Sequence, residues 1–132
     1  EELEKMPPEE RWDFWKGEFS RCIRCYACRN VCPACFCERC FVDISLPQWV
    51  SPLPRWQDNL IFQLTRMLHV AGRCVDCGEC ERACPVGIPL RSLAGKMTDI
   101  VEELFDYRAG MDKDVSPPLT AYEPTDPQDF IR

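Results

Sequence analysis

Eleven cysteines in a chain of 132 residues carry the chemistry that this sequence could perform. Eight of them form two runs with identical spacing, C-x2-C-x2-C-x3-C-P: Cys22, Cys25, Cys28 and Cys32 in the first run, and Cys74, Cys77, Cys80 and Cys84 in the second. In a small chain such density indicates either a disulfide framework or metal ligation. The two runs form an internal repeat, and the rest of the chain must position two equivalent loops.

The spacing favours iron–sulfur clusters over the alternatives. Two-residue gaps let one tight loop place three thiolates around one face of a cubane, with backbone N–H groups directed at its sulfides. The x3-C-P step then turns the chain away, so a fourth thiolate must come from elsewhere. Zinc knuckles need only two pairs of ligands per metal and have no use for three cysteines at this spacing, twice over.

Composition excludes several other classes of function. Twenty-two acidic against sixteen basic residues give a formal charge of −6, which argues against a nucleic-acid partner. The most apolar stretch, residues 60–70, is interrupted by Gln63, Arg66 and His69, so no membrane span is expected. The first residues, EELEKM, lack the basic start and apolar run of a signal peptide, and a cytoplasmic, reducing location is predicted.

Helical spacing of apolar residues predicts three helices and an all-α fold. An N-terminal amphipathic helix within residues 1–20 carries Trp12, Trp15 and Phe19, and a proline-rich connector covers residues 41–54. The two longer helices are expected over residues 55–71 and 89–107. Their apolar stripes are Trp56, Leu60, Ile61, Leu64, Met67 and Leu68 in the former, and Leu90, Leu93, Ala94, Met97, Val101, Leu104 and Phe105 in the latter. Residues 109–132, rich in proline and aspartate, are expected to form an extended tail.

The two runs resemble those of dicluster ferredoxins, and the 41 residues between Pro33 and Arg73 favour the α-helical ferredoxin type. A helix-bearing link and the segment PVGIPLRSLAGKMTDIVEELF directly after the second run are similar to that branch. It occurs in heterodisulfide reductase small iron–sulfur subunits, in succinate dehydrogenase iron–sulfur subunits and in the glutamate synthase small subunit. The resemblance covers roughly residues 18–108, and a dicluster domain is expected over residues 21–108.

This resemblance implies two [4Fe-4S] clusters with crossed ligation. One cluster would be held by Cys22, Cys25, Cys28 and Cys84, and the other by Cys74, Cys77, Cys80 and Cys32. It also implies a chain that relays single electrons within a multisubunit anaerobic oxidoreductase and makes no bonds itself. The implied partners are a flavin- or cluster-bearing donor and a catalytic acceptor.

Three further cysteines, Cys35, Cys37 and Cys40, depart from the plain family pattern. They suggest a third iron–sulfur or zinc centre, completed by His69, by Asp43 or by a partner chain. The alternatives are that they are buried free thiols, or that Cys35 replaces Cys32 as a cluster ligand. Two rival functions follow: a redox enzyme component that binds substrate at this third centre, and a zinc-binding interaction module.

Charge differs between the two runs. The first contains Arg21, Arg24 and Arg29, whereas the second contains more acidic side chains. Because positive surroundings favour the reduced, more negative cluster, the sequence suggests a higher reduction potential for the cluster of the first run.

Overall fold

The computed structural model describes residues 2–118, 120 and 124, and within them the secondary structure is helical. The elements in chain order are α1 (Glu2–Lys5), α2 (Pro8–Ser20), α3 (Ala27–Asn30), a 3-10 helix η1 (Phe41–Asp43), α4 (Trp56–Val70), α5 (Glu79–Arg82) and α6 (Leu90–Phe105). The described residues contain no β-strand, only an isolated antiparallel bridge between Ser45 and Gln48. The predicted all-α class is therefore confirmed.

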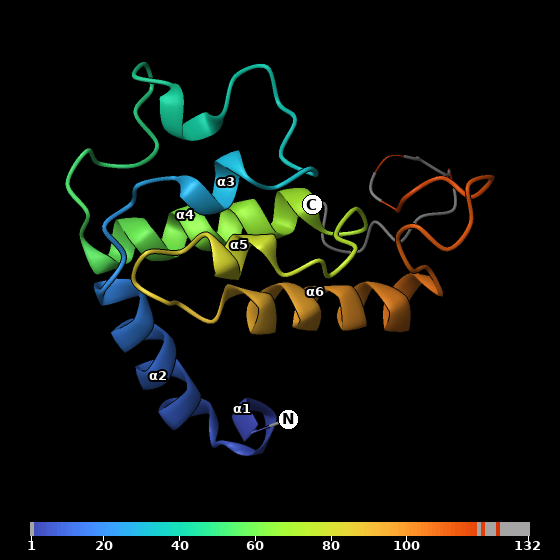
Figure 1. Cartoon of the computed structure of the whole chain (residues 1–132), viewed down its shortest axis with the longest axis horizontal. Helices are drawn as coiled ribbons and strands as arrows, with labels where there is room; N and C mark the ends of the chain where they lie inside the picture. Colours follow the sequence, from blue (N-terminus) through green and yellow to red (C-terminus); the bar gives the residue numbers. More distant parts are fainter. Residues whose placement is uncertain (1, 119, 121–123, 125–132) are drawn as a thin grey trace.

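The two long helices form the base on which the cysteine runs lie. Figure 1 shows α4 and α6 extending along the molecule, with α2 descending from one end, and α4 packs against both α2 and α6. Helix α2 begins at Pro8, whose fixed φ suits the first turn of a helix. The N-terminal region thus comprises two helices, α1 and α2, separated at Met6 and Pro7.

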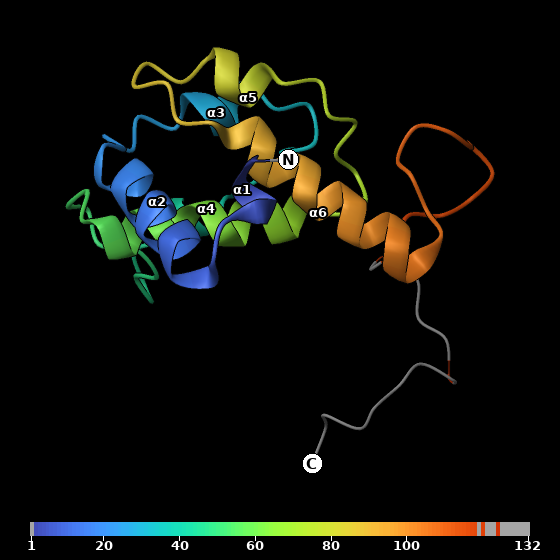
Figure 2. The same cartoon turned by 90° about the horizontal axis from the view of Figure 1, so that it is seen from below.

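The internal repeat is visible in space as well as in sequence. Each cysteine run contains one short helix, α3 in the first and α5 in the second, and these two helices lie side by side (Figure 2). The runs therefore meet each other although 41 residues separate them.

Helix α4 lies where the sequence predicts it, but only part of the expected stripe is buried: Met67 lies in the core and Leu60 packs against it. Ile61, Leu64 and Leu68 of the expected stripe are 48%, 43% and 60% exposed. The buried residues are Asn59, Phe62, Gln63, Arg66, Met67 and Val70. Half of these buried residues are polar, and hydrophobic periodicity does not detect polar residues in a core.

Helix α6 follows its predicted stripe more closely. Leu90, Ala94 and Val101 are buried, whereas Leu104 and Phe105 near its end are exposed. The helix ends where Asp106 adopts a left-handed conformation with φ 48°, a common way to terminate a helix.

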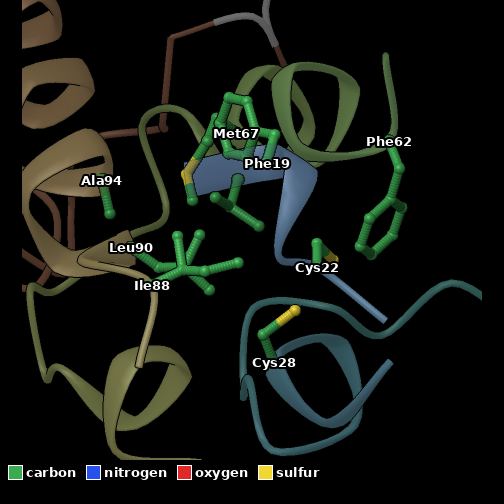
Figure 3. Close-up of a cluster of buried hydrophobic side chains, with 9 residues drawn as sticks. Phe19, Cys22, Cys28, Phe62, Met67, Ile88, Leu90 and Ala94 are labelled. Carbon is green, nitrogen blue, oxygen red and sulfur yellow. The ribbon is translucent and has the colours of Figure 1, made fainter. Parts of the chain in front are cut away.

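The hydrophobic core is continuous with the cysteine loops. Figure 3 shows Cys22 and Cys28 beside Phe19, Phe62 and Ile88, from four different segments of the chain. All five are buried. The loops of the runs are thus anchored in the core rather than resting on the surface.

The segment after α6 turns back towards the second run. A Cβ atom added at Gly72 would lie 3.3 Å from the ring of Pro118, and one added at Gly110 would lie 3.4 Å from Val75. Of the tail expected over residues 109–132, positions 119, 121–123 and 125–132 lie outside the described residues. No helix within the described part of the chain has the length and apolar character that crossing a membrane requires.

Candidate iron–sulfur sites

The two cysteine runs have the same backbone conformation. The third residue of each run, Arg24 or Asp76, has φ 52°, and the fifth, Tyr26 or Gly78, has φ 62° or 75°. Three of these four are not glycine, although a left-handed conformation costs free energy for other residues. When residues with positive φ alternate with residues of ordinary φ, successive backbone N–H groups point towards the inside of the loop. Such a loop suits an anionic centre.

The fourth cysteine of each run follows its short helix in the same way. Cys32 N–H donates to Arg29 O at 3.2 Å, and Cys84 N–H donates to Glu81 O at 3.0 Å. A proline follows each of these cysteines and prevents the helix from continuing. The fourth thiol is therefore carried away from the first three thiols of its own run.

One small cavity is lined by three cysteines of the first run and one of the second. Its cysteines are Cys22, Cys25, Cys28 and Cys84, and its other walls are mainly apolar. Two N–H groups are directed at these sulfur atoms: Gln63 Nε2 lies 3.7 Å from Cys28 Sγ, and Ile88 N lies 3.4 Å from Cys84 Sγ. Hydrogen bonds to sulfur are characteristic of iron–sulfur sites.

A second small cavity contains the complementary set. Cys74, Cys77 and Cys80 of the second run line it together with Cys32 of the first. Arg66 of α4 also lines it. The two cavities thus contain the two crossed sets of four cysteines that the family resemblance implies.

Burial disfavours free thiolates in these cavities, and bound iron would counter that effect. Burial raises the pKa of the Cys22, Cys28 and Cys80 thiols, because a thiolate is poorly solvated there. Iron favours the thiolate form and would offset that cost. Among the described residues no three His, Cys, Asp or Glu side chains gather closely enough to hold a single metal ion. A cubane separates its four cysteine sulfurs more widely than one ion does, so this spacing does not oppose a cluster.

Arg66 has one donor atom available for such a group. Its side chain is buried, and its Nη2 has no hydrogen-bond partner among the described residues. A buried donor without a partner is costly, and the sulfur atoms of a cluster would accept from it.

Asn59 fixes the start of the first run. Its Nδ2 donates to Phe19 O at 2.9 Å and to Cys22 O at 2.8 Å, and the residue is fully buried. These bonds satisfy carbonyls at the end of α2 and at the first cysteine, where the chain leaves helical geometry.

Sequence reasoning did not identify Asn59, Gln63 and Arg66 as site residues. Their spacing, i, i+4 and i+7, places them on one face of a helix. That signal is present in the sequence, but it is hidden by the apolar residues on the opposite side.

The three additional cysteines lie together around a larger cavity of about 480 Å³. Cys35, Cys37 and Cys40 line it, as do Asp43 and His69. The thiols have separate neighbours, however. Cys35 contacts Cys32 and Arg66, and Cys40 contacts Arg29. A third centre at these residues stays a prediction.

Cys32 and Cys35 form a close pair next to the second cavity. A hydrogen bond from the Cys35 thiol lowers the pKa of Cys32 to about 6, whereas the same contact raises the pKa of Cys35. Cys32, and not Cys35, lines the second cavity with Cys74, Cys77 and Cys80, and this placement favours Cys32 as the cluster ligand.

Each arginine of the first run has at least one ion-pair or hydrogen-bond partner within the chain. Arg21 pairs with Glu18, and Arg29 Nη1 lies 2.9 Å from Asp43 Oδ2. Arg24 donates to the carbonyl oxygens of Ser51 and Leu53. Counting charges along the run therefore overstates the positive charge that this cluster would experience.

Comparison with known proteins identifies the family. Residues 18–88 match the family model described as a 4Fe-4S dicluster domain. The chain is 36% identical over 114 residues to the F420-dependent formate dehydrogenase subunit beta of Methanocaldococcus jannaschii, an alignment covering 86% of this chain and 29% of that protein. It is 38% identical over 122 residues to the F420-dependent formate dehydrogenase 1 subunit beta of Methanococcus maripaludis, with 92% and 30% covered.

The chain spans about three tenths of the length of these curated relatives. The family match includes both cysteine runs and more than half of the 132 residues. The chain therefore belongs to the 4Fe-4S dicluster domain family, whose two [4Fe-4S] clusters make it an iron–sulfur electron-transfer domain.

Proposed function

We propose that this chain relays electrons within a complex related to F420-dependent formate dehydrogenase. The support comes from the two relatives, which are named as beta subunits of such an enzyme and align with most of this chain. A subunit named beta implies at least one further subunit, and the catalytic site is proposed to lie outside this chain.

The proposed ligands are the two crossed cysteine sets. Cys22, Cys25, Cys28 and Cys84 would hold the first-run cluster, and Cys74, Cys77, Cys80 and Cys32 would hold the second-run cluster. The observation that carries this proposal is that each set lines one cavity. The N–H groups of Gln63 and Ile88 at sulfur atoms support it for the first-run cluster.

The chemistry explains why two one-electron carriers are useful. Oxidation of formate to carbon dioxide releases two electrons and one proton. Because each cluster carries one electron at a time, the electrons would pass singly through this chain towards the site where F420 is used. The short distance between α3 and α5 brings the two runs close together, as sequential transfer requires.

The test uses the full-length protein purified without oxygen. We expect about eight irons with matching sulfide per chain, and EPR signals of both clusters after chemical reduction. Formate should reduce the clusters only in the presence of the catalytic subunit, and oxidised F420 should reoxidise them in the complete complex. A protein that contains eight irons but that formate cannot reduce in the complete complex would contradict the proposed role while leaving the clusters intact.

A further inference from the structure

Arg66 is a buried cation in the middle of α4. Its side chain is 4% exposed, and its Nε donates a hydrogen bond to Gln63 Oε1 at 3.3 Å. None of the ion pairs found among the described residues includes Arg66. A charge in this position is neither hydrated nor paired with a carboxylate, which requires a compensating negative group nearby.

Among the described residues, cysteine sulfurs are the groups in contact with Arg66 that could carry a negative charge. The guanidinium contacts the thiols of Cys35 and Cys80 and lies near Cys32. Arg66 also lines the cavity that contains the second crossed cysteine set. A cluster held there, with four thiolates, would be the negative partner of this arginine.

The other charges at that cavity are largely neutralised by each other. Asp76 Oδ2 lies 3.0 Å from Arg91 Nη2, and Glu79 pairs with Arg82. All four side chains are at least partly exposed, so water and salt screen them. Arg66 is therefore the charge whose field acts through the low-dielectric interior.

The first-run cavity also has a buried arginine, whose Nη1 likewise lacks a partner among the described residues, but whose Nη2 is bound to carbonyl groups. Its buried arginine, Arg24, donates through Nη2 to the carbonyl oxygens of Ser51 and Leu53. Those carbonyl dipoles offset part of its charge. In the hydrogen bonds found among the described residues, Arg66 donates to no backbone carbonyl oxygen, and its Nε donates to the side-chain amide oxygen of Gln63.

We propose that Arg66 raises the reduction potential of the cluster held by Cys32, Cys74, Cys77 and Cys80. Reduction adds one negative charge to that cluster, and a buried positive charge beside its sulfur ligands stabilises the reduced state more than the oxidised state. Arg66 would thus act on the potential of this cluster through its charge, without being one of the cluster's ligands. The inference rests on the crossed ligand sets of the proposed function.

The experiment compares three variants of the full-length protein by redox titration with EPR detection. Arg66→Gln removes the charge, Arg66→Lys retains it, and Arg55→Gln removes an exposed charge at the start of the same helix. The signal of the second-run cluster is assigned beforehand as the one that Cys77→Ser alters. Arg66→Met replaces the Gln variant if that variant does not load its clusters.

We expect Arg66→Gln to lower the ratio of reduced to oxidised second-run cluster at least tenfold at the original midpoint, which is a negative shift of about 59 mV. Arg66→Lys should retain most of the potential, and Arg55→Gln should leave it unchanged. Equal potentials in Arg66→Gln and the unaltered protein would overturn the inference, as would a larger shift at the first-run cluster. A shift in Arg66→Lys as large as that in Arg66→Gln would show that packing rather than charge is responsible.

Failure of the underlying ligand proposal gives a different result. The unaltered protein would then contain fewer than about eight irons per chain, or Cys77→Ser and Cys32→Ser would alter different EPR signals. Neither outcome depends on Arg66.

Discussion

Gln63 and Arg66 are joined inside the core by a hydrogen bond of 3.3 Å from Arg66 Nε to Gln63 Oε1. The amide group of Gln63 also donates to Cys28 Sγ at 3.7 Å. The two side chains thereby connect a cysteine of the first-run cavity with the cysteines of the second-run cavity. One turn of α4 provides a polar contact to each proposed cluster.

Gln63→Leu should lower the reduction potential of the first-run cluster. The variant removes an N–H···S hydrogen bond, and such bonds stabilise the reduced cluster. The measurement is an EPR-monitored redox titration. Gln57→Leu is the matched control, because Gln57 is exposed near the start of the same helix. An unchanged first-run potential in Gln63→Leu would show that this contact does not influence the cluster.

Cys84→Ser should alter the same EPR signal as Cys25→Ser, although Cys84 belongs to the second run. The reason is that both residues line the first-run cavity. Cys32→Ser should correspondingly alter the signal that Cys77→Ser alters. If Cys84→Ser instead affected the cluster of Cys74, Cys77 and Cys80, the crossed ligation would be wrong.

Asn59→Leu should destabilise the folded protein. It removes the donor to Cys22 O and one of two donors to Phe19 O, which also accepts from Cys22 N–H, and a buried carbonyl left without a partner costs about 1–3 kcal/mol. The midpoint of urea unfolding, followed anaerobically by cluster absorbance, should fall. Asn30→Leu serves as the control because Asn30 is exposed. Identical midpoints for the Asn59 variant and the unaltered protein would show that the Asn59 hydrogen bonds do not stabilise the fold.

Cys37→Ser should leave the iron, sulfide and zinc content unchanged. The thiols of Cys35 and Cys40 contact Cys32 and Arg29, respectively, and the described residues contain no group of three ligands close enough to hold one metal ion. Metal analysis of the anaerobically purified variant provides the check, with Cys77→Ser as the control that should lose iron. Loss of metal from Cys37→Ser would instead establish the third centre that the extra cysteines suggest.

The redox titration of the unaltered protein also tests which of the two clusters has the higher reduction potential. The sequence places Arg21, Arg24 and Arg29 in the first run and predicts the higher potential there. In the structure, Arg21 and Arg29 are paired with carboxylates, so this prediction has lost part of its basis. The order of the two measured potentials tests it directly.

The sequence by itself determined the family, the two clusters and the positions of the long helices. The spacing of eight cysteines is a local property: it fixes how three thiolates of one loop can surround a cluster. The limits of α4 and α6 follow from helical periodicity, which is also local. The repeat of the run predicted two equivalent loops, and the matching φ angles are what that repeat produces.

Only the tertiary structure decided which side of α4 is buried and what its polar residues do. Asn59, Gln63 and Arg66 are buried because their partners, Cys22 O, Cys28 Sγ and the thiols of Cys35 and Cys80, come from distant parts of the chain. Hydropathy cannot anticipate such burial, since a polar side chain enters a core only where a specific partner offsets its lost hydration. The pairing of the surface arginines was hidden for the same reason: it depends on which carboxylates the fold brings within reach.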